Sequence, residues 1–214
     1  IREACREWVK KEISPIIEDA CQKAEFPKKI INGLGEIGAF GPYIPVEYGG
    51  SGLDQISYGI IMQELERGDS GIRSTASVQS SLVMYPIWKY GSETQKIKFL
   101  PKLASGEFMG CFGLTEPDHG SDPGGMKTNI KDIGDYYLLN GTKNWITNGN
   151  TASVYLVVAQ TDVEKGHKGI NAFIVEKDME GFIVGQKENK LGIRGSDTHS
   201  LMFTDVKVPK ENRI

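Results

Sequence analysis

The sequence CFGLTEPDHGSD at residues 111–122 lies where the chain changes from helical to strand patterns. Its first part continues a short apolar run that begins at Phe108 and predicts a strand. The run then opens into a loop that contains a proline, a glycine and several acidic or hydroxyl side chains. Backbone N–H groups in such a loop are free to face a ligand, so the segment can hold a pyrophosphate.

Helical patterns dominate the residues before this loop. Apolar residues recur at helical spacing, and Pro15 is expected to break the first helix. Pro27 suits the first turn of the second helix, and SETQ at residues 92–95 has the form of a capping box. The predicted helices cover residues 1–24, 27–37, about 53–67, about 70–90, and a stretch that begins at residue 92.

Strand patterns dominate the residues after Gly106. The pair Asn140-Gly141 between two of them predicts a hairpin turn. Helices followed by strands indicate an α+β fold, with an all-helical domain at 1–107 and a β domain at 108–214 whose antiparallel sheet forms a closed or nearly closed barrel. The predicted strands are residues 108–114, 136–139, 143–147, 154–160, 172–176, 182–185 and 199–206.

Composition excludes several classes of function. The 214 residues carry a net charge of −3 with both signs interspersed, which disfavours a nucleic-acid binder. No apolar run is long enough for membrane insertion. Three widely spaced cysteines suggest neither disulfides nor a zinc site, and fit a reducing compartment. The chain opens at Ile1, without Met and inside an amphipathic pattern, so we expect that residue 1 is not the natural start.

A second block, WITN at residues 145–148, supplies a planar aromatic side chain and a threonine hydroxyl. Proteins use such groups to position a flavin ring and to approach its reactive nitrogen. In this order and at this spacing, the two blocks resemble the flavin-contacting segments of the acyl-CoA dehydrogenase family. The resemblance covers essentially the whole chain, as the N-terminal helical and middle β domains of that family. The C-terminal four-helix domain of the family is absent from the chain.

The resemblance implies an FAD site. The hydroxyl of Thr115 would bond the pyrimidine end of the flavin, and that of Thr147 would approach flavin N5. Ser121 would serve both the pyrophosphate and the nearby thioester substrate. The implied cofactor-binding residues are Phe112, Leu114, Thr115, Gly120, Ser121, Trp145, Ile146 and Thr147.

The run DSGIRSTASVQSS at residues 69–81 is dense in hydroxyls and contains one arginine. On a helix, Arg73 and Ser77 lie one turn apart, so a guanidinium and a hydroxyl can converge on one anionic group. The alternative is a partly exposed helix whose serines bond back to its own carbonyls. The run resembles the glutaryl-CoA dehydrogenase branch of the family, although Ile72 stands where some members have an aromatic residue. The implied substrate-binding residues are Arg73, Ser74, Ser77, Ser121 and Glu66.

The resemblance implies oxidative decarboxylation of glutaryl-CoA to crotonyl-CoA and CO2, as in lysine and tryptophan degradation. Electrons would leave through an electron-transferring flavoprotein, and the enzyme would be a homotetramer in the bacterial cytoplasm or the mitochondrial matrix. The catalytic base, a glutamate in this family, is expected beyond Ile214, so no catalytic residue is assigned here and the chain alone is expected to be inactive. The alternatives are a short-chain acyl-CoA dehydrogenase without decarboxylation, and a non-catalytic fragment that binds flavin or acyl-CoA.

Other motifs carry less weight. GLGEIG at residues 33–38 satisfies a dinucleotide fingerprint, with Asp54 beyond it, but no strand precedes it and no helix follows. Its glycines are expected to end a helix and permit close packing.

Arg194 is expected to pack at a domain or subunit boundary, and His167 and His199 receive no role.

An acidic cluster in the first block is a weak candidate for a metal site. Zinc sites favour Cys and His, and hard cations need a definite ligand geometry. A solvated acidic turn is therefore the favoured interpretation. The cluster comprises Glu116, Asp118, His119 and Asp122.

Overall fold

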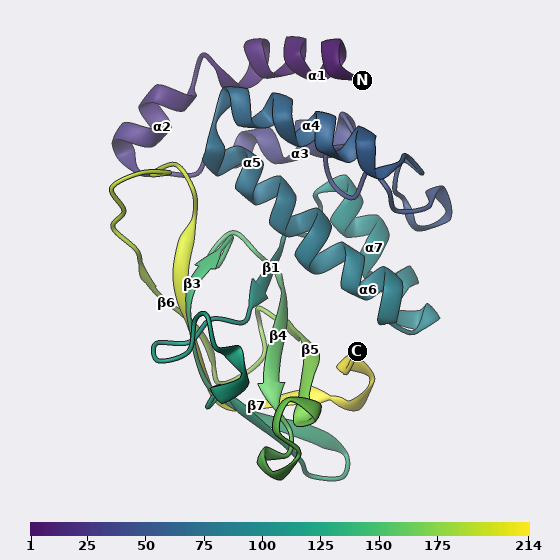
Figure 1. The fold of residues 1–214 in the computed structure, drawn as a ribbon, viewed down its shortest axis with the longest axis vertical. Coiled ribbons are helices and arrows are strands. Elements are labelled where there is room, and N and C mark those ends of the chain that lie inside the picture. Colours follow the sequence, from purple (N-terminus) through teal and green to yellow (C-terminus); the bar gives the residue numbers. More distant parts are fainter. The chain divides into compact units, whose positions relative to one another are not determined.

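The computed structural model describes residues 1–214, which form two compact units. The helical unit consists of Ile1–Met109 with Asn189–Asp197, and the β unit consists of Gly110–Glu188 with Thr198–Ile214 (Figure 1). The predicted order of helices first and a sheet afterwards is confirmed. None of the helices combines the length and the apolar character that crossing a bilayer requires.

The helical unit contains seven α-helices. The break expected at Pro15 is confirmed, because a π-helical turn at Val9–Ile13 follows α1 and α2 begins only at Ile17. The capping box at residues 92–95 is also confirmed, with Gln95 N donating to Ser92 Oγ at 3.2 Å and Ser92 N to Gln95 Oε1 at 2.8 Å. The helices are α1 (Arg2–Trp8), α2 (Ile17–Lys23), α3 (Ile31–Glu36), α4 (Gln55–Gly68), α5 (Ser70–Ser77), α6 (Tyr85–Tyr90) and α7 (Glu93–Ser105).

A π-helical segment at Val78–Met84 joins α5 to α6, inside the stretch predicted as one helix. Such insertions free backbone groups that need other partners. Here Ser80 accepts a hydrogen bond from Gly41 N at 2.9 Å, and its carbonyl accepts one from the Tyr43 hydroxyl at 2.9 Å. The loop around Gly41 therefore stabilises the irregular helix that follows the predicted substrate residues.

The GLGEIG motif lies on α3 and the turn that follows it, where its glycines permit close packing, as predicted. A Cβ atom on Gly35 would lie 2.4 Å from the carbonyl oxygen of Ser105, and one on Gly33 would lie 2.9 Å from the Trp8 ring. Gly38 has φ +69°, which ends the helix. Helix packing, rather than a nucleotide, accounts for these positions.

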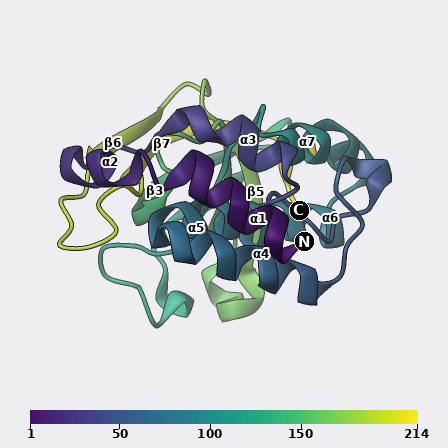
Figure 2. The same ribbon diagram turned by 90° about the horizontal axis from the view of Figure 1, so that it is seen from above.

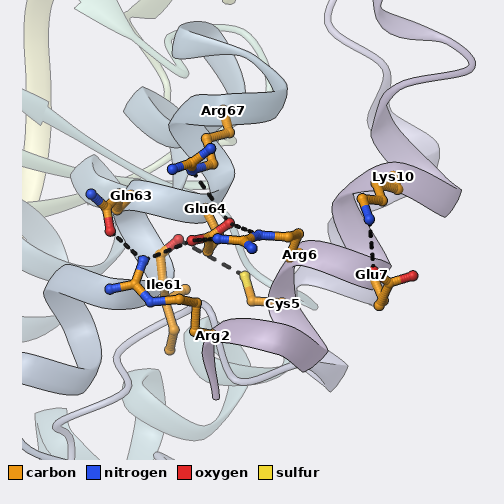
Figure 3. A network of polar contacts seen from close by, with 9 residues as sticks. All are labelled: Arg2, Cys5, Arg6, Glu7, Lys10, Ile61, Gln63, Glu64 and Arg67. Atoms are coloured by element: carbon orange, nitrogen blue, oxygen red, sulfur yellow. Dashed lines mark hydrogen bonds and ion pairs between the residues drawn. The ribbon is translucent and has the colours of Figure 1, made fainter.

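Helix α1 packs against α4 (Figure 2). Glu64 on α4 is a fully buried carboxylate that holds the two helices together (Figure 3). Arg6 Nε lies 2.9 Å from Glu64 Oε2, and Arg2 Nη1 lies 2.8 Å from Oε1. Arg67 Nε approaches the same carboxylate at 3.6 Å. These contacts, led by the hydrogen bond from Arg6, lower the pKa of Glu64 from its ordinary 4.5 to about 2.

We expect Glu64→Gln to lower the midpoint of thermal unfolding near neutral pH, and this loss to shrink in acid. A carboxyl group with a lowered folded-state pKa stabilises the fold fully above its unfolded pKa, here near 4.5, and that stabilisation is lost as the pH falls toward about 2. Melting curves near neutral pH and at about pH 3 test this linkage. Glu7→Gln, which removes only an exposed pair with Lys10, is the control. A Glu64→Gln deficit of equal size at both pH values would contradict it.

The β unit is one seven-stranded sheet, in the order β1-β4-β2-β3-β7-β6 with β5 also paired to β4. The pairing is mainly antiparallel, but β1 runs parallel to β4 in the register Gly110↔Val154, and β2 meets β4 in one parallel bridge. The strands are β1 (Gly110–Gly113), β2 (Asn129–Asp132), β3 (Tyr136–Thr147), β4 (Val154–Gln160), β5 (Ile170–Glu176), β6 (Phe182–Lys187) and β7 (Thr198–Pro209).

The hairpin turn predicted at Asn140-Gly141 is wrong, because β3 continues through both residues. The register between β3 and β7 shifts here, so the pair forms a β-bulge. Asn140 Nδ2 donates to Asp205 Oδ1 at 2.9 Å on β7. Gly141 has φ +146°, and a Cβ there would lie 2.5 Å from Thr128 Oγ1. The turn before β3 lies instead around Gly134, after a strand, β2, that the pattern missed.

Candidate functional site

The first sequence block consists of β1 and the loop that follows it, residues 114–128, which we call the flavin loop. Alternation along β1 sends Cys111 into the apolar core of the sheet and leaves Phe112 half-buried on the other face. Leu114 and Thr115, also half-buried, begin the loop. The strand therefore presents Phe112 on the side away from the core cluster.

The structure brings the two sequence blocks together inside the β unit. Asn144 N donates to the carbonyl oxygen of Thr115 at 2.8 Å. Lys143 Nζ donates to the carbonyl oxygen of Leu114 at 3.0 Å, and Asn148 Nδ2 donates to that of Gly110 at 3.0 Å. The second half of β3 is thus bonded to the beginning of the flavin loop, and Asn148, which follows β3, is bonded to β1.

Trp145 is an exposed aromatic residue on a left-handed backbone. Its φ is +60°, which is uncommon for a bulky residue, and its exposed fraction is 58%. The register of β3 against β7 shifts between Lys143 and Ile146, which places Trp145 in a bulge. Ile146 is 2% exposed and belongs to the core, so only its main chain is available to a ligand. The bulge thus turns one large ring outward beside a buried neighbour.

Unused polar groups also occur in the two sequence blocks. Thr115 and Thr147 are half-buried, and their hydroxyls make no hydrogen bond within the chain. The backbone N–H groups of Gly120 and Ser121 are likewise unused, and a Cβ on Gly120 would meet no atom within 4 Å. An exposed ring, free hydroxyls and open amides fit the ring and pyrophosphate of a flavin nucleotide.

A buried ion pair lies between the two blocks, and sequence reasoning missed it. Lys143 Nζ is 2.8 Å from Glu116 Oε1, with side-chain exposed fractions of 0% and 4%. Burial lowers the pKa of Lys143, and it outweighs the hydrogen bond and charge of Glu116, which raise that pKa. Burial raises the pKa of Glu116, but hydrogen bonds from Lys143 and the backbone outweigh it and bring the pKa below its ordinary value. A lysine in a strand pattern gave no signal of burial.

The expected solvated acidic turn is wrong for Glu116. Its carboxylate accepts hydrogen bonds from Lys127 N at 2.7 Å and Thr128 N at 3.0 Å. Asp118 does match the expectation, because it is exposed and pairs with Lys127 Nζ at 2.8 Å. The acidic residues and His119 do not gather into a group that could hold a metal ion. Glu116 was misplaced because the backbone donors that bury it lie eleven and twelve residues away.

The predicted substrate residues of the helical unit lie on α4 and α5. Asp69 separates these helices and caps α5, with Asp69 Oδ1 accepting from Ile72 N at 2.9 Å. Arg73 Nε on α5 donates to Glu66 Oε2 on α4 at 2.5 Å. That bond, with another from Ser70, lowers the pKa of Glu66. Glu66 therefore fixes the guanidinium through Nε alone.

Arg73, Ser74 and Ser77 are half-buried along one stretch of α5. The predicted back-bonding occurs at Ser81, whose hydroxyl donates to Ser77 O at 2.6 Å. The hydroxyls of Ser74 and Ser77, in contrast, make no hydrogen bond in the chain. With the terminal nitrogens of Arg73 also unbonded, donors for a small anion remain on this helix.

Arg194 caps the C-terminus of α2. Its Nε donates to Cys21 O at 3.1 Å, and its Nη1 donates to Lys190 O at 3.2 Å. Cys21 lies in the last turn of α2 and Lys190 in the same loop as Arg194, so the guanidinium ties this loop to the end of the helix. The observed contacts give Arg194 a structural role within the helical unit.

Comparison with known proteins gives consistent matches along the chain. Residues 1–107 match the family described as acyl-CoA dehydrogenase, N-terminal domain, and residues 111–206 match the acyl-CoA dehydrogenase middle domain. An acyl-CoA dehydrogenase of Bacillus subtilis is 42% identical over 100% of the chain and 56% of its own length. The mitochondrial short-chain specific acyl-CoA dehydrogenase of Rattus norvegicus is 41% identical over 100% of the chain and 52% of its own length.

Solved structures agree with these relatives. A glutaryl-CoA dehydrogenase from Mycobacterium smegmatis in complex with FADH2 superposes with a TM-score of 0.94 at 43% identity, covering 99% of this chain and 53% of that one. Butyryl-CoA dehydrogenase from Megasphaera elsdenii gives a TM-score of 0.95 at 42% identity, covering 99% and 56%. The chain spans about half the length of the curated relatives it matches.

Proposed function

Because the chain belongs to the acyl-CoA dehydrogenase family, we propose that the complete enzyme is an FAD-dependent acyl-CoA dehydrogenase that acts on glutaryl-CoA. The observation that carries the choice of substrate is the half-buried guanidinium of Arg73, fixed at Nε by Glu66 with its terminal nitrogens unbonded. A planar guanidinium suits a carboxylate, which it can bind at two points.

The residues of the two sequence blocks would hold FAD. The amides of Gly120 and Ser121 suit its pyrophosphate, while the Trp145 ring and the hydroxyls of Thr115 and Thr147 suit its flavin ring. Ile146 would contribute its main chain, beside Phe112 and Leu114. When bound, FAD supplies an acceptor for a hydride from the substrate.

A short-chain acyl-CoA is the second candidate substrate, because several relatives carry the short-chain name. An unsubstituted acyl chain, however, has no charge to pair with Arg73. Leaving a half-buried arginine and two serine hydroxyls facing an apolar chain would cost free energy. The helix is better matched to a thioester whose far end is a carboxylate.

In the proposed reaction, a base removes the α-proton of the thioester and a hydride leaves the β-carbon. Loss of CO2 from the distal end, with uptake of a proton, then gives crotonyl-CoA. The carboxylates of the predicted site residues are already paired, because Glu116 pairs with Lys143 and Glu66 with Arg73. We therefore place the base beyond Ile214, and expect residues 1–214 alone to be inactive.

Electron-transferring flavoprotein is the proposed electron acceptor, and the proposed assembly is a homotetramer. The reaction would serve lysine and tryptophan degradation, in the cytoplasm of a bacterium or the matrix of a mitochondrion. These proposals rest on the family resemblance and the substrate.

The purified complete enzyme is expected to contain FAD and to show flavin absorption in the visible range. Trp145→Ala should weaken FAD uptake, because it removes an exposed ring that the core does not use. Tyr136→Ala, at the other end of β3, is the matched aromatic control and should bind FAD as wild type does. A colourless wild-type protein that takes up no added FAD would contradict the proposal.

A further inference from the structure

The ion pair of Lys143 and Glu116 closes the flavin loop at both of its ends. Glu116 Oε2 accepts from Lys127 N at 2.7 Å, and Oε1 accepts from Thr128 N at 3.0 Å, where the loop ends. Lys143 Nζ donates to Glu116 at 2.8 Å and to Leu114 O at 3.0 Å, where the loop begins. One buried pair therefore fixes a loop of more than a dozen residues.

The same pair adjoins the predicted flavin contacts along both chain segments. Glu116 directly follows Thr115, and Lys143 stands two residues before Trp145. Between them, Asn144 N donates to Thr115 O at 2.8 Å. A shift of this pair would move the backbone of Thr115 and of Trp145 together.

The clamp, by which we mean Glu116 with its donors Lys127 N, Thr128 N and Lys143 Nζ, requires a carboxylate. Its two oxygens accept three hydrogen bonds here, whereas the amide nitrogen of a glutamine would accept none. A buried carboxylate in turn needs a positive partner to offset the loss of its hydration. Lys143 supplies that charge from β3, so the clamp also ties the loop to the strand of Trp145.

We propose that Lys143 and Glu116 are positioning residues that hold the flavin loop and Trp145 in the arrangement that binds FAD. This inference rests on the proposed function. Neither side chain need touch the cofactor, because both are buried beneath the loop and strand that would contact it.

The test compares wild type with Lys143→Met, Glu116→Gln and the double variant in the complete enzyme. The double variant leaves no uncompensated buried charge, so it should regain the stability that each single variant loses. It lacks the carboxylate clamp, so the amides of Lys127 and Thr128 should exchange with deuterium about tenfold faster or more in the FAD-free protein. Its dissociation constant for FAD should rise about tenfold or more, with an altered visible circular dichroism of the flavin.

Two further variants complete the test. Glu116→Asp keeps the charge but shortens the side chain, and it should show the same faster exchange and weaker FAD binding. It decides the test if the double variant does not fold. Asp118→Asn removes only the exposed pair with Lys127 in the same loop, and should leave FAD binding unchanged.

The outcomes separate the inference from the proposed function. A folded double variant with the exchange rates and FAD affinity of wild type would show that the pair only stabilises the fold, and would overturn the inference alone. A wild-type enzyme that binds no FAD would overturn both.

Discussion

Arg73→Lys in the complete enzyme is expected to lower kcat/KM for glutaryl-CoA by about 10- to 150-fold. Turnover of butyryl-CoA should stay within about twofold of wild type, because that substrate has no distal carboxylate to lose a contact. Lysine keeps the charge but cannot bind a carboxylate at two points. Its single ammonium also cannot pair with Glu66 and bind the substrate in the way that Arg73 does through separate nitrogens.

Steady-state kinetics with both substrates give the ratio directly. Arg67→Lys is the matched control, since it alters a neighbouring arginine on α4 that contacts Glu64 instead. Equal losses on the two substrates after Arg73→Lys would mean that the residue supports the fold through Glu66 and does not recognise the acyl group.

Lys143→Met is expected to lower the free energy of unfolding by about 3–5 kcal/mol, because it leaves the Glu116 carboxylate buried without its partner. Urea denaturation measures the loss. Lys23→Met, which breaks an exposed ion pair with Asp19, should cost only about 0–1 kcal/mol. A loss of similar size in both variants would argue that the buried pair contributes no more than a surface pair.

Local signals in the sequence predicted the helical unit well. The SETQ box and Pro15 act through neighbouring residues, so they form the same structures in the folded chain. Asn140-Gly141 is also a local signal, but the structure that it adopts depends on pairing with β7. Pairing across the bulge, with Asn140 bonded to Asp205, kept β3 continuous through a sequence that favours a turn elsewhere.

The sequence patterns did not predict which charged side chains are buried. Glu64 sits in a helical pattern, and only the fold brings Arg2 and Arg6 from α1 to its carboxylate. Likewise, the partners of Glu116 come from the far end of its own loop and from β3. The residues of the two sequence blocks could be named beforehand because their order and spacing carry a recognisable pattern, whereas the pair that joins the blocks could not.

The proposed reaction is tested most directly by mixing the FAD-loaded complete enzyme with glutaryl-CoA in the absence of oxygen, following the visible flavin absorption and the release of CO2 together. The expected result is rapid bleaching of the flavin band, with CO2 and crotonyl-CoA formed in amounts matching the FAD reduced. Bleaching by butyryl-CoA but not by glutaryl-CoA, or bleaching by glutaryl-CoA without CO2, would contradict the proposed oxidative decarboxylation.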